Sequence, residues 1–224
     1  MDGIGQRISA IKASLPEGVT LVAVSKFHPA EAIMQAYGSG HRIFGESRAT
    51  ELVNKAKELP EDIQWHFIGH LQTNKVRAVM PYVTCIHSID SERLLRLVNT
   101  EAERIGRTVD VLLQVHVACE ETKFGFTPEE FECLTSSGIL SELSAVRVRG
   151  VMGMASNVDD NDRIAADFRL IKNMYDKLAE VLKSSDGAPC DTISMGMSHD
   201  YRLAIECGSN MVRIGTTIFG EREY

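Results

Sequence analysis

The chain has 224 residues, 44% of them hydrophobic and 25% charged, the proportions of an ordinary globular protein that can bury a sizeable core. Its net charge of −7 and its scattered lysines and arginines argue against a nucleic-acid surface. The sequence has no run of about 18 apolar residues that could span a membrane, and its N-terminus lacks a signal-peptide core, so we expect a cytoplasmic protein. The five cysteines contain no CxxC pair, so we expect reduced thiols and neither a disulfide framework nor a zinc site.

Strand-like and helix-like segments alternate along the whole chain. An amphipathic helix over Met1–Leu15 comes first. The predicted strands are Thr20–Ser25, Arg42–Phe44, Gln64–Ile68, Thr84–Ser88, Val109–Val117, Arg147–Met154, Thr192–Met195 and Met211–Ile214. The predicted helices are Ala30–Tyr37, Glu46–Glu58, Asn74–Met80, Ser91–Ile105, Pro128–Ser136, Asp160–Lys183 and Asp200–Cys207.

Several predicted helices carry boundary signals. Pro29 and Pro128 suit a first helical turn, where the missing N–H is not needed. Ser91 and Ser198 are predicted N-caps, because a serine side chain can accept a hydrogen bond from an otherwise unpaired amide.

The alternation predicts a single α/β domain over residues 1–224. Strands that alternate with helices are expected to run parallel and to be joined by crossover helices. Eight such units in about 200 residues predict a (β/α)8 TIM barrel, preceded by the extra N-terminal helix. An open doubly wound sheet is the alternative. It is less favoured, because no strand is followed by the GxGxxG turn of dinucleotide-binding sheets.

Lys26 follows the first predicted strand, and Val22 and Val24 share its side of the pleat. Their apolar character predicts that the lysine faces inward. Desolvation would favour its neutral amine, which is the better nucleophile toward a carbonyl. Arg213 in the last strand is expected on the same inner surface, where a guanidinium is costly unless it meets a ligand or a carboxylate.

Two loops after the last two strands are expected to hold a phosphate, since TIM barrels commonly bind one there. The loops are Ser194–Ser198 and Ile214–Thr217, and both place glycine beside hydroxyl groups. The helix that begins near Ser198 would point its positive end toward the same anion.

An inward lysine, an internal arginine and a phosphate cradle together predict a pocket for pyridoxal 5′-phosphate (PLP). Lys26 would form the Schiff base and Arg213 would face the pyridine nitrogen. Because arginine does not accept a proton, the cofactor would be a weak electron sink. A class I aldolase-type barrel, whose lysine attacks a sugar-phosphate carbonyl, is a competing interpretation.

The chain also resembles the pyridoxal-phosphate homeostasis protein family in several motifs that occur in the same order. They are Val24–Lys26, Phe44–Glu46, Trp65–Gly69 with Leu71–Lys75, His87–Asp90, Ser194–Ser198 and Met211–Gly220. The resemblance implies a barrel similar to the N-terminal domain of bacterial alanine racemase. It implies these roles: Lys26 as the Schiff-base lysine, Arg213 as the partner of the pyridine nitrogen, and Ser198, Gly215 and Thr216 as phosphate ligands.

One position departs from the family. An asparagine usually follows Phe-Gly-Glu, and this chain has Ser47 there. A serine is shorter, so any contact of the asparagine side chain beside the cofactor is not carried over.

We expect a non-catalytic PLP carrier that acts in intracellular vitamin B6 homeostasis or delivers the cofactor to apo PLP-dependent enzymes. An amino-acid racemase or a related PLP-dependent enzyme is the alternative. A racemase of this kind would use a second, β-rich domain with an acid–base tyrosine, which we do not find before the last residue, Tyr224. A monomer is expected, because a closed barrel has no free sheet edges.

Other side chains are open to a structural or a functional interpretation. His66 and His87 are expected to be hydrogen-bonded histidines of the core or rim, and His116, inside a predicted strand, to be structural. Met152 and Met154 are expected either to pack against the cofactor ring or to fill the core, and both roles suit a flexible apolar side chain.

Overall fold

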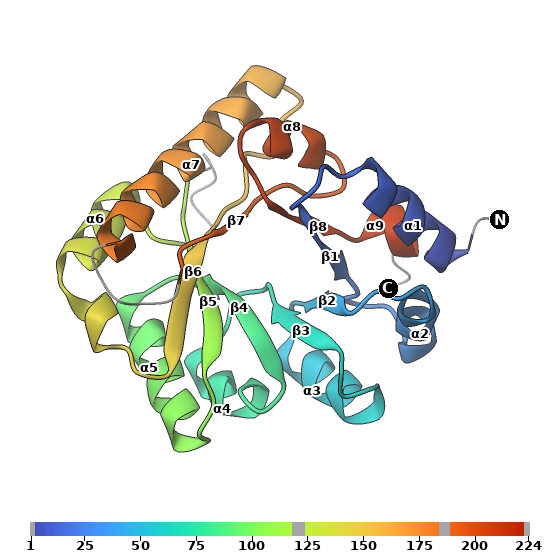
Figure 1. Ribbon diagram of the computed structural model, residues 1–224, viewed down its shortest axis with the longest axis horizontal. Helices are drawn as coiled ribbons and strands as arrows, with labels where there is room; N and C mark the ends of the chain where they lie inside the picture. Colours follow the sequence, from blue (N-terminus) through green and yellow to red (C-terminus); the bar gives the residue numbers. More distant parts are fainter. Residues whose placement is uncertain (1–2, 118–123, 184–188, 222–224) are drawn as a thin grey trace.

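Eight parallel strands close into a barrel at the centre of the molecule (Figure 1). The computed structural model describes residues 3–117, 124–183 and 189–221. The strands are β1 (Thr20–Val24), β2 (Ile43–Glu46), β3 (Gln64–Phe67), β4 (Val83–Ile89), β5 (Val109–Gln114), β6 (Val146–Met152), β7 (Thr192–Ser194) and β8 (Met211–Ile214). Each strand pairs with the next along the chain and β8 pairs with β1. This confirms the predicted (β/α)8 barrel and excludes the open sheet.

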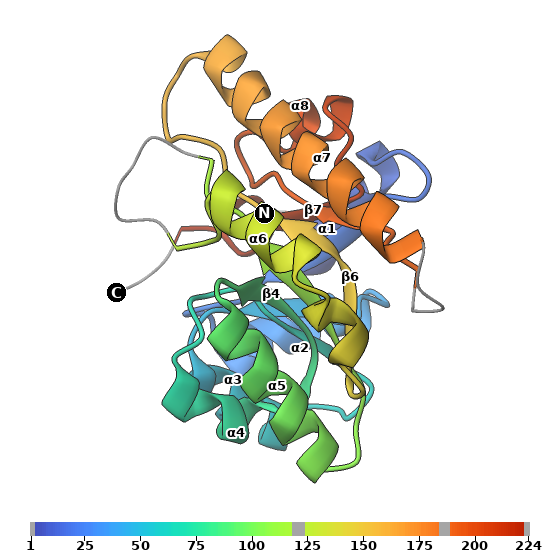
Figure 2. The same ribbon diagram turned by 90° about the vertical axis from the view of Figure 1, so that its left-hand side faces the viewer.

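Helices surround the barrel, and α1 (Ile4–Ser14) precedes it as predicted. The other helices are α2 (Ala30–Gly38), α3 (Ala49–Glu58), α4 (Val76–Val79), α5 (Glu92–Arg104), α6 (Pro128–Ser136), α7 (Asn161–Lys183), α8 (Tyr201–Glu206) and α9 (Thr216–Phe219), with 3-10 turns η1 (Thr73–Lys75) and η2 (Ile139–Glu142). Figure 2 shows the long α7 beside α6 and α8. Along the described residues, no helix has the length and apolar character needed to cross a bilayer.

The clearest boundary error concerns β2 and the helix after it. The predicted helix Glu46–Glu58 begins only at Ala49, because Glu46 ends β2 and pairs with Phe67 of β3. The local sequence is rich in helix formers, and strand pairing overrides that preference. The predicted strand Val109–Val117 was also too long, since β5 ends at Gln114.

Two helix starts agree with the sequence signals and one differs. Pro128 is the first residue of α6, and the Ser91 hydroxyl caps α5 by accepting from the Leu94 amide at 3.3 Å. Pro29 is the N-cap of α2 and so lies just before the first turn, although the helix itself begins at Ala30 as predicted.

Alternating side chains of β1 separate two layers of the core. Leu21 and Ala23 belong to the large apolar cluster that joins the strands to the surrounding helices. Val22 points the other way and is in register with Arg213 of β8. A second, small cluster of Cys85, Leu112 and Met152 fills part of the barrel interior. Met152 is therefore a core side chain.

Gly150 allows β6 and β7 to approach each other. Its φ is +150°, and a Cβ at this position would lie 1.8 Å from the Thr192 carbonyl oxygen. Gly150 and Thr192 are register partners, so this contact lies on the seam between the two strands. A side chain at position 150 is not compatible with this pairing.

Candidate functional site

Lys26 lies on the turn that follows β1, at the C-terminal end of the barrel, and is half-buried. The next residue, Phe27, has a positive φ of 68°, an uncommon conformation for a residue with a side chain. Its amide donates to Glu51 Oε1 at 2.6 Å. The His28 ring stacks on Phe219 of α9 with centroids 5.0 Å apart. The turn is therefore held from α3 on one side and from α9 on the other.

A buried ion-pair network supports this turn from below. Lys55 Nζ donates to the Ser25 carbonyl oxygen at 2.9 Å, to Glu46 Oε1 at 2.7 Å and to Glu51 Oε1 at 2.7 Å. Ser25 Oγ donates to the same Glu46 oxygen at 2.6 Å. The three acceptors use all three ammonium hydrogens. Lys55 thus links β2 and α3 to the residue immediately before Lys26.

Glu46 is the most perturbed carboxyl group of this network. Burial raises its pKa to about 7, although the nearby Lys55 ammonium opposes this shift. Its second oxygen, Oε2, is buried and has no hydrogen-bond partner among the described residues. A proton can therefore be held on Oε2 without breaking either bond to Oε1.

Arg213 lies inside the barrel, as predicted, and only 4% of its surface is exposed. Its Nη1 donates to the Ser194 carbonyl oxygen at 2.8 Å and to Ser194 Oγ at 2.7 Å, and Nη2 donates to the Gly153 carbonyl oxygen at 3.0 Å. Desolvation lowers the pKa of the guanidinium to about 10, so it stays charged at neutral pH. Two of its five N–H groups meet no acceptor among the described residues and are available to a ligand.

Two buried histidines continue the polar chain from Ser194. His87 Nδ1 lies 3.1 Å from Ser194 Oγ, and its Nε2 lies 2.8 Å from His66 Nδ1. Burial lowers the pKa of His66 to about 4 and that of His87 well below its usual value, so both rings are neutral. The prediction that they are hydrogen-bonded core histidines is confirmed. His116 follows β5 at its C-terminal end and does not lie in a strand interior.

The two predicted phosphate loops meet beside the end of β1. Ser198 Oγ accepts from the Gly215 amide at 3.3 Å, which joins the loop after β7 to the loop after β8. A Cβ on Gly215 would lie 3.2 Å from the Val24 carbonyl oxygen, two residues before Lys26. Thr216 is exposed and begins α9.

Ser198 does not cap a helix, and this prediction was wrong. The N-cap of α8 is Asp200, whose Oδ1 accepts from the Met197 amide at 2.6 Å. Helix α8 starts at Tyr201, one residue later than predicted, and the Ser198 hydroxyl accepts from an amide of the β8 loop instead.

Ser47 lies at the end of β2 against a glycine of the loop after β3. A Cβ on Gly69 would lie 2.3 Å from the Ser47 carbonyl oxygen. The two loops are therefore in close backbone contact. Met154 is half-buried after β6, next to the Gly153 carbonyl that binds Arg213, whereas Met152, the last residue of β6, is buried in the small core cluster.

The structure thus brings Lys26, Ser198 and Gly215 to one end of the barrel, with Arg213 in the interior below. Sequence reasoning missed Glu46, Lys55 and Ser194. Lys55 was hidden because its partner Glu46 had been assigned to the same helix, where residues nine apart do not meet. Ser194 was recognised only as part of a loop.

Comparison with known proteins places the chain among the relatives of alanine racemase. Residues 1–223 match the family described as alanine racemase, N-terminal domain. A pyridoxal phosphate homeostasis protein of Schizosaccharomyces pombe is 40% identical over 91% of this chain and 84% of its own length. One of Escherichia coli (strain K12) is 36% identical, with 93% and 88% covered. The chain therefore belongs to the pyridoxal phosphate homeostasis protein family.

Solved structures agree with this assignment. PipY of Synechococcus elongatus with PLP bound superposes with a TM-score of 0.87 at 35% identity, over 97% of this chain and 100% of that one. The alanine racemase of Enterococcus faecalis gives a TM-score of 0.74 at 16% identity, with 57% of its chain covered. At that identity the racemase shows the shared barrel fold alone.

Proposed function

We propose that residues 1–224 act as a single domain that holds PLP as a Schiff base on Lys26 and serves in PLP homeostasis or cofactor delivery. One observation carries the proposal: the two ends of the sequence meet at the C-terminal end of the barrel. Gly215 touches Val24 just before Lys26, and Arg213 is paired with Val22. The names of the relatives and the PLP bound to PipY support the choice of cofactor.

The residues fit the chemical groups of PLP. Lys26 offers an amine for the aldehyde. Ser198, Gly215 and Thr216 offer two hydroxyls and a backbone amide for the phosphate, and the 3.3 Å bond between the first two is long enough to yield to a better acceptor. Arg213 keeps two unused N–H groups for the pyridine nitrogen.

The same arginine supports a non-catalytic role. A bound PLP ring stabilises carbanions when its pyridine nitrogen is protonated. Arg213 donates hydrogen bonds and stays charged, since even its lowered pKa is about 10, so it would keep that nitrogen unprotonated. The protein would therefore retain the cofactor with little carbanion chemistry.

Borohydride reduction followed by peptide mapping tests the covalent site. Loading with PLP and reduction should place one pyridoxyl group on Lys26. Lys26→Ala should lose the label and the yellow colour, whereas Lys75→Ala, at the same end of the barrel, should keep both. A label on another lysine of the wild type would refute the assignment, and a colourless protein would favour the aldolase-type alternative.

Transfer to an apo PLP-dependent enzyme tests delivery. When the PLP-loaded protein is mixed with such an apo-enzyme, the activity of the enzyme should return faster than PLP is released from the loaded protein to a competing PLP trap.

A stereochemical assay over a panel of amino acids should show no substantial turnover that depends on Lys26, and such turnover would support a racemase instead. Light scattering tests the expected monomer. The cytoplasmic location stays a prediction.

A further inference from the structure

Three side chains with metal-binding atoms converge inside the barrel, away from Lys26. His66 of β3 and Cys85 of β4 are register partners, and His87 lies two residues further along β4, so all three point inward. One nitrogen of each imidazole and the Cys85 sulfur lie within 4.8 Å of one another. Three convergent nitrogen and sulfur atoms are the donor set of a transition-metal site.

The surroundings orient one of the histidines as a ligand. All three side chains are buried. His87 Nδ1 is held by Ser194 Oγ at 3.1 Å, which leaves Nε2 directed at the cluster, and such an outer hydrogen bond is typical of metal-bound histidine. Leu112 and Met152 pack against Cys85 in a small apolar cluster.

We propose that His66, Cys85 and His87 form a binding site for Cu(I). Thiolate and imidazole ligands suit this soft cation. A Cu(I) ion and one thiolate have no net charge, whereas Zn²⁺ would leave one positive charge in the interior beside the Arg213 guanidinium.

The ligands need only small shifts to bind. With bonds as long as those of zinc, about 2.0 Å to nitrogen and 2.3 Å to sulfur, a trigonal site would have its donor atoms about 3.5 Å apart. His66 Nδ1 and His87 Nε2 are 2.8 Å apart, with one proton between them. On metal binding this proton would move to the second nitrogen of the imidazole that carries it, and the two ligand nitrogens would separate slightly. Two Cu–N bonds and one Cu–S bond form, and the Cys85 thiol releases one proton to solvent.

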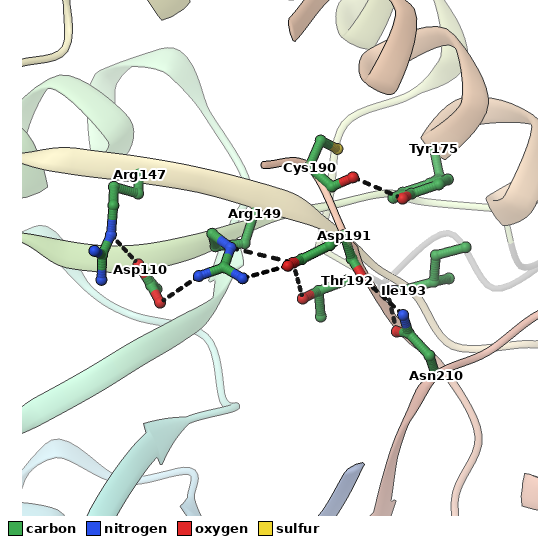
Figure 3. A network of polar contacts seen from close by, with 9 residues as sticks. All are labelled: Asp110, Arg147, Arg149, Tyr175, Cys190, Asp191, Thr192, Ile193 and Asn210. Atoms are coloured by element: carbon green, nitrogen blue, oxygen red, sulfur yellow. Dashed lines mark hydrogen bonds and ion pairs between the residues drawn. The ribbon is translucent and has the colours of Figure 1, made fainter. Parts of the chain in front are cut away.

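A cavity at the opposite end of the barrel from Lys26 provides access. It has a volume of about 360 Å³, and both His66 and Cys85 line it among the first residues of the strands. Figure 3 shows part of its rim, where Arg149 lies between Asp110 and Asp191. The site and the proposed PLP site are therefore reached from different faces. The site also escaped the sequence prediction because its ligands come from two strands and form no local CxxC-type motif.

Competition with a chromophoric Cu(I) chelator, bicinchoninate, tests the proposal under anaerobic conditions. The starting protein is the full chain with Cys119, Cys133, Cys190 and Cys207 changed to serine, so that Cys85 is its last thiol. We expect it to withdraw one equivalent of Cu(I), with and without PLP. Adding Cys85→Ala, which removes only the sulfur atom, should weaken binding by at least roughly 100-fold, since outer-shell partners alone are worth 10–100-fold. His66→Gln should weaken it similarly.

Circular dichroism and the PLP absorbance show whether each variant is folded. X-ray absorption should find one sulfur and two nitrogen neighbours of copper. Failure of the Cys85-containing protein to withdraw Cu(I), or equal binding by its folded Cys85→Ala derivative, would overturn the proposal. Cys85-dependent binding of Zn²⁺ in preference to Cu(I) would refute the charge argument and the choice of metal.

Discussion

At the scale of single residues, the buried carboxyl group of Glu46 makes stability depend on pH. Its pKa is raised to about 7 in the folded protein by burial, above the ordinary value of 4.5 that it has when unfolded. Between these two values the folded state holds a proton that the unfolded state has lost. The contribution of Glu46 is therefore largest below pH 4.5 and is lost as the pH rises through 7.

We accordingly expect the wild type to lose stability relative to Glu46→Gln between pH 5 and 8. The difference in the free energy of unfolding should change by roughly 3 kcal/mol at most, at about 1.36 kcal/mol per pH unit. Urea denaturation of both proteins at several pH values measures it. A difference that does not vary with pH would show that the group is ionised throughout.

Lys55 is the cation on which the same network depends. Lys55→Met leaves Glu46 and Glu51 without their shared partner. At pH 8, where the Glu46 of the wild type is ionised, breaking a buried pair in this way costs about 3–5 kcal/mol. The substitution also frees the Ser25 carbonyl, so we expect weaker PLP loading at Lys26, which absorbance titration at pH 8 would detect. Lys55→Arg should recover part of both losses.

Lys172→Met is the matched control for this change. Lys172 pairs with Asp176 at 2.6 Å, but both side chains are well exposed, at 36% and 52%. Exposed pairs contribute little, so the loss should stay below about 1 kcal/mol with unchanged PLP loading. Equal effects of the two methionine variants would argue against a special role for the buried pair.

At the scale of elements, the pairing of β6 with β7 depends on a glycine. Gly150→Ala would force a methyl group against the Thr192 carbonyl oxygen at a φ of +150°. We expect it to destabilise the barrel by more than about 3 kcal/mol, the upper part of the usual range for overpacking. Gly38→Ala, in α2 with nothing within 4 Å, should be neutral or stabilising by up to about 1 kcal/mol. Thermal unfolding of both variants compares them, and a tolerated Gly150→Ala would mean that β6 and β7 can separate.

The order and type of the elements could be predicted from sequence, because each strand and helix carries its own periodicity. The packing around Lys26 could not. It depends on Glu46 being in β2, and local preference favours a helix there, while the β2–β3 pairing decides otherwise. Lys26 and Arg213 were identified because their strands are neighbours in any closed barrel. The Ser194 bond to Arg213 required the actual register of β7 and β8.

At the scale of the whole molecule, the first and last elements close the barrel together. Helix α1 packs against α2 and α9 (Figure 1), and Arg7 Nε donates to the Ile218 carbonyl oxygen at 2.6 Å. The proposed PLP site uses the same junction, since it takes Lys26 from one end of the sequence and Gly215 from the other. Binding of a ligand that bridges these ends should stabilise the entire barrel against unfolding.

PLP at about 100 times its dissociation constant should then add about 2.7 kcal/mol to the free energy of unfolding. For a chain of this size, that corresponds to a rise in Tm of about 5–10 °C. Lys26→Ala keeps the phosphate loops and Arg213, so a small rise should remain. Ser198→Ala with Thr216→Ala should weaken the response to PLP while Lys26 can still be reduced with borohydride. If PLP raises the Tm of the Lys26 variant and of the loop variant as much as that of the wild type, PLP binds elsewhere. The affinity of a ligand at the junction would depend on residues from both ends of the chain.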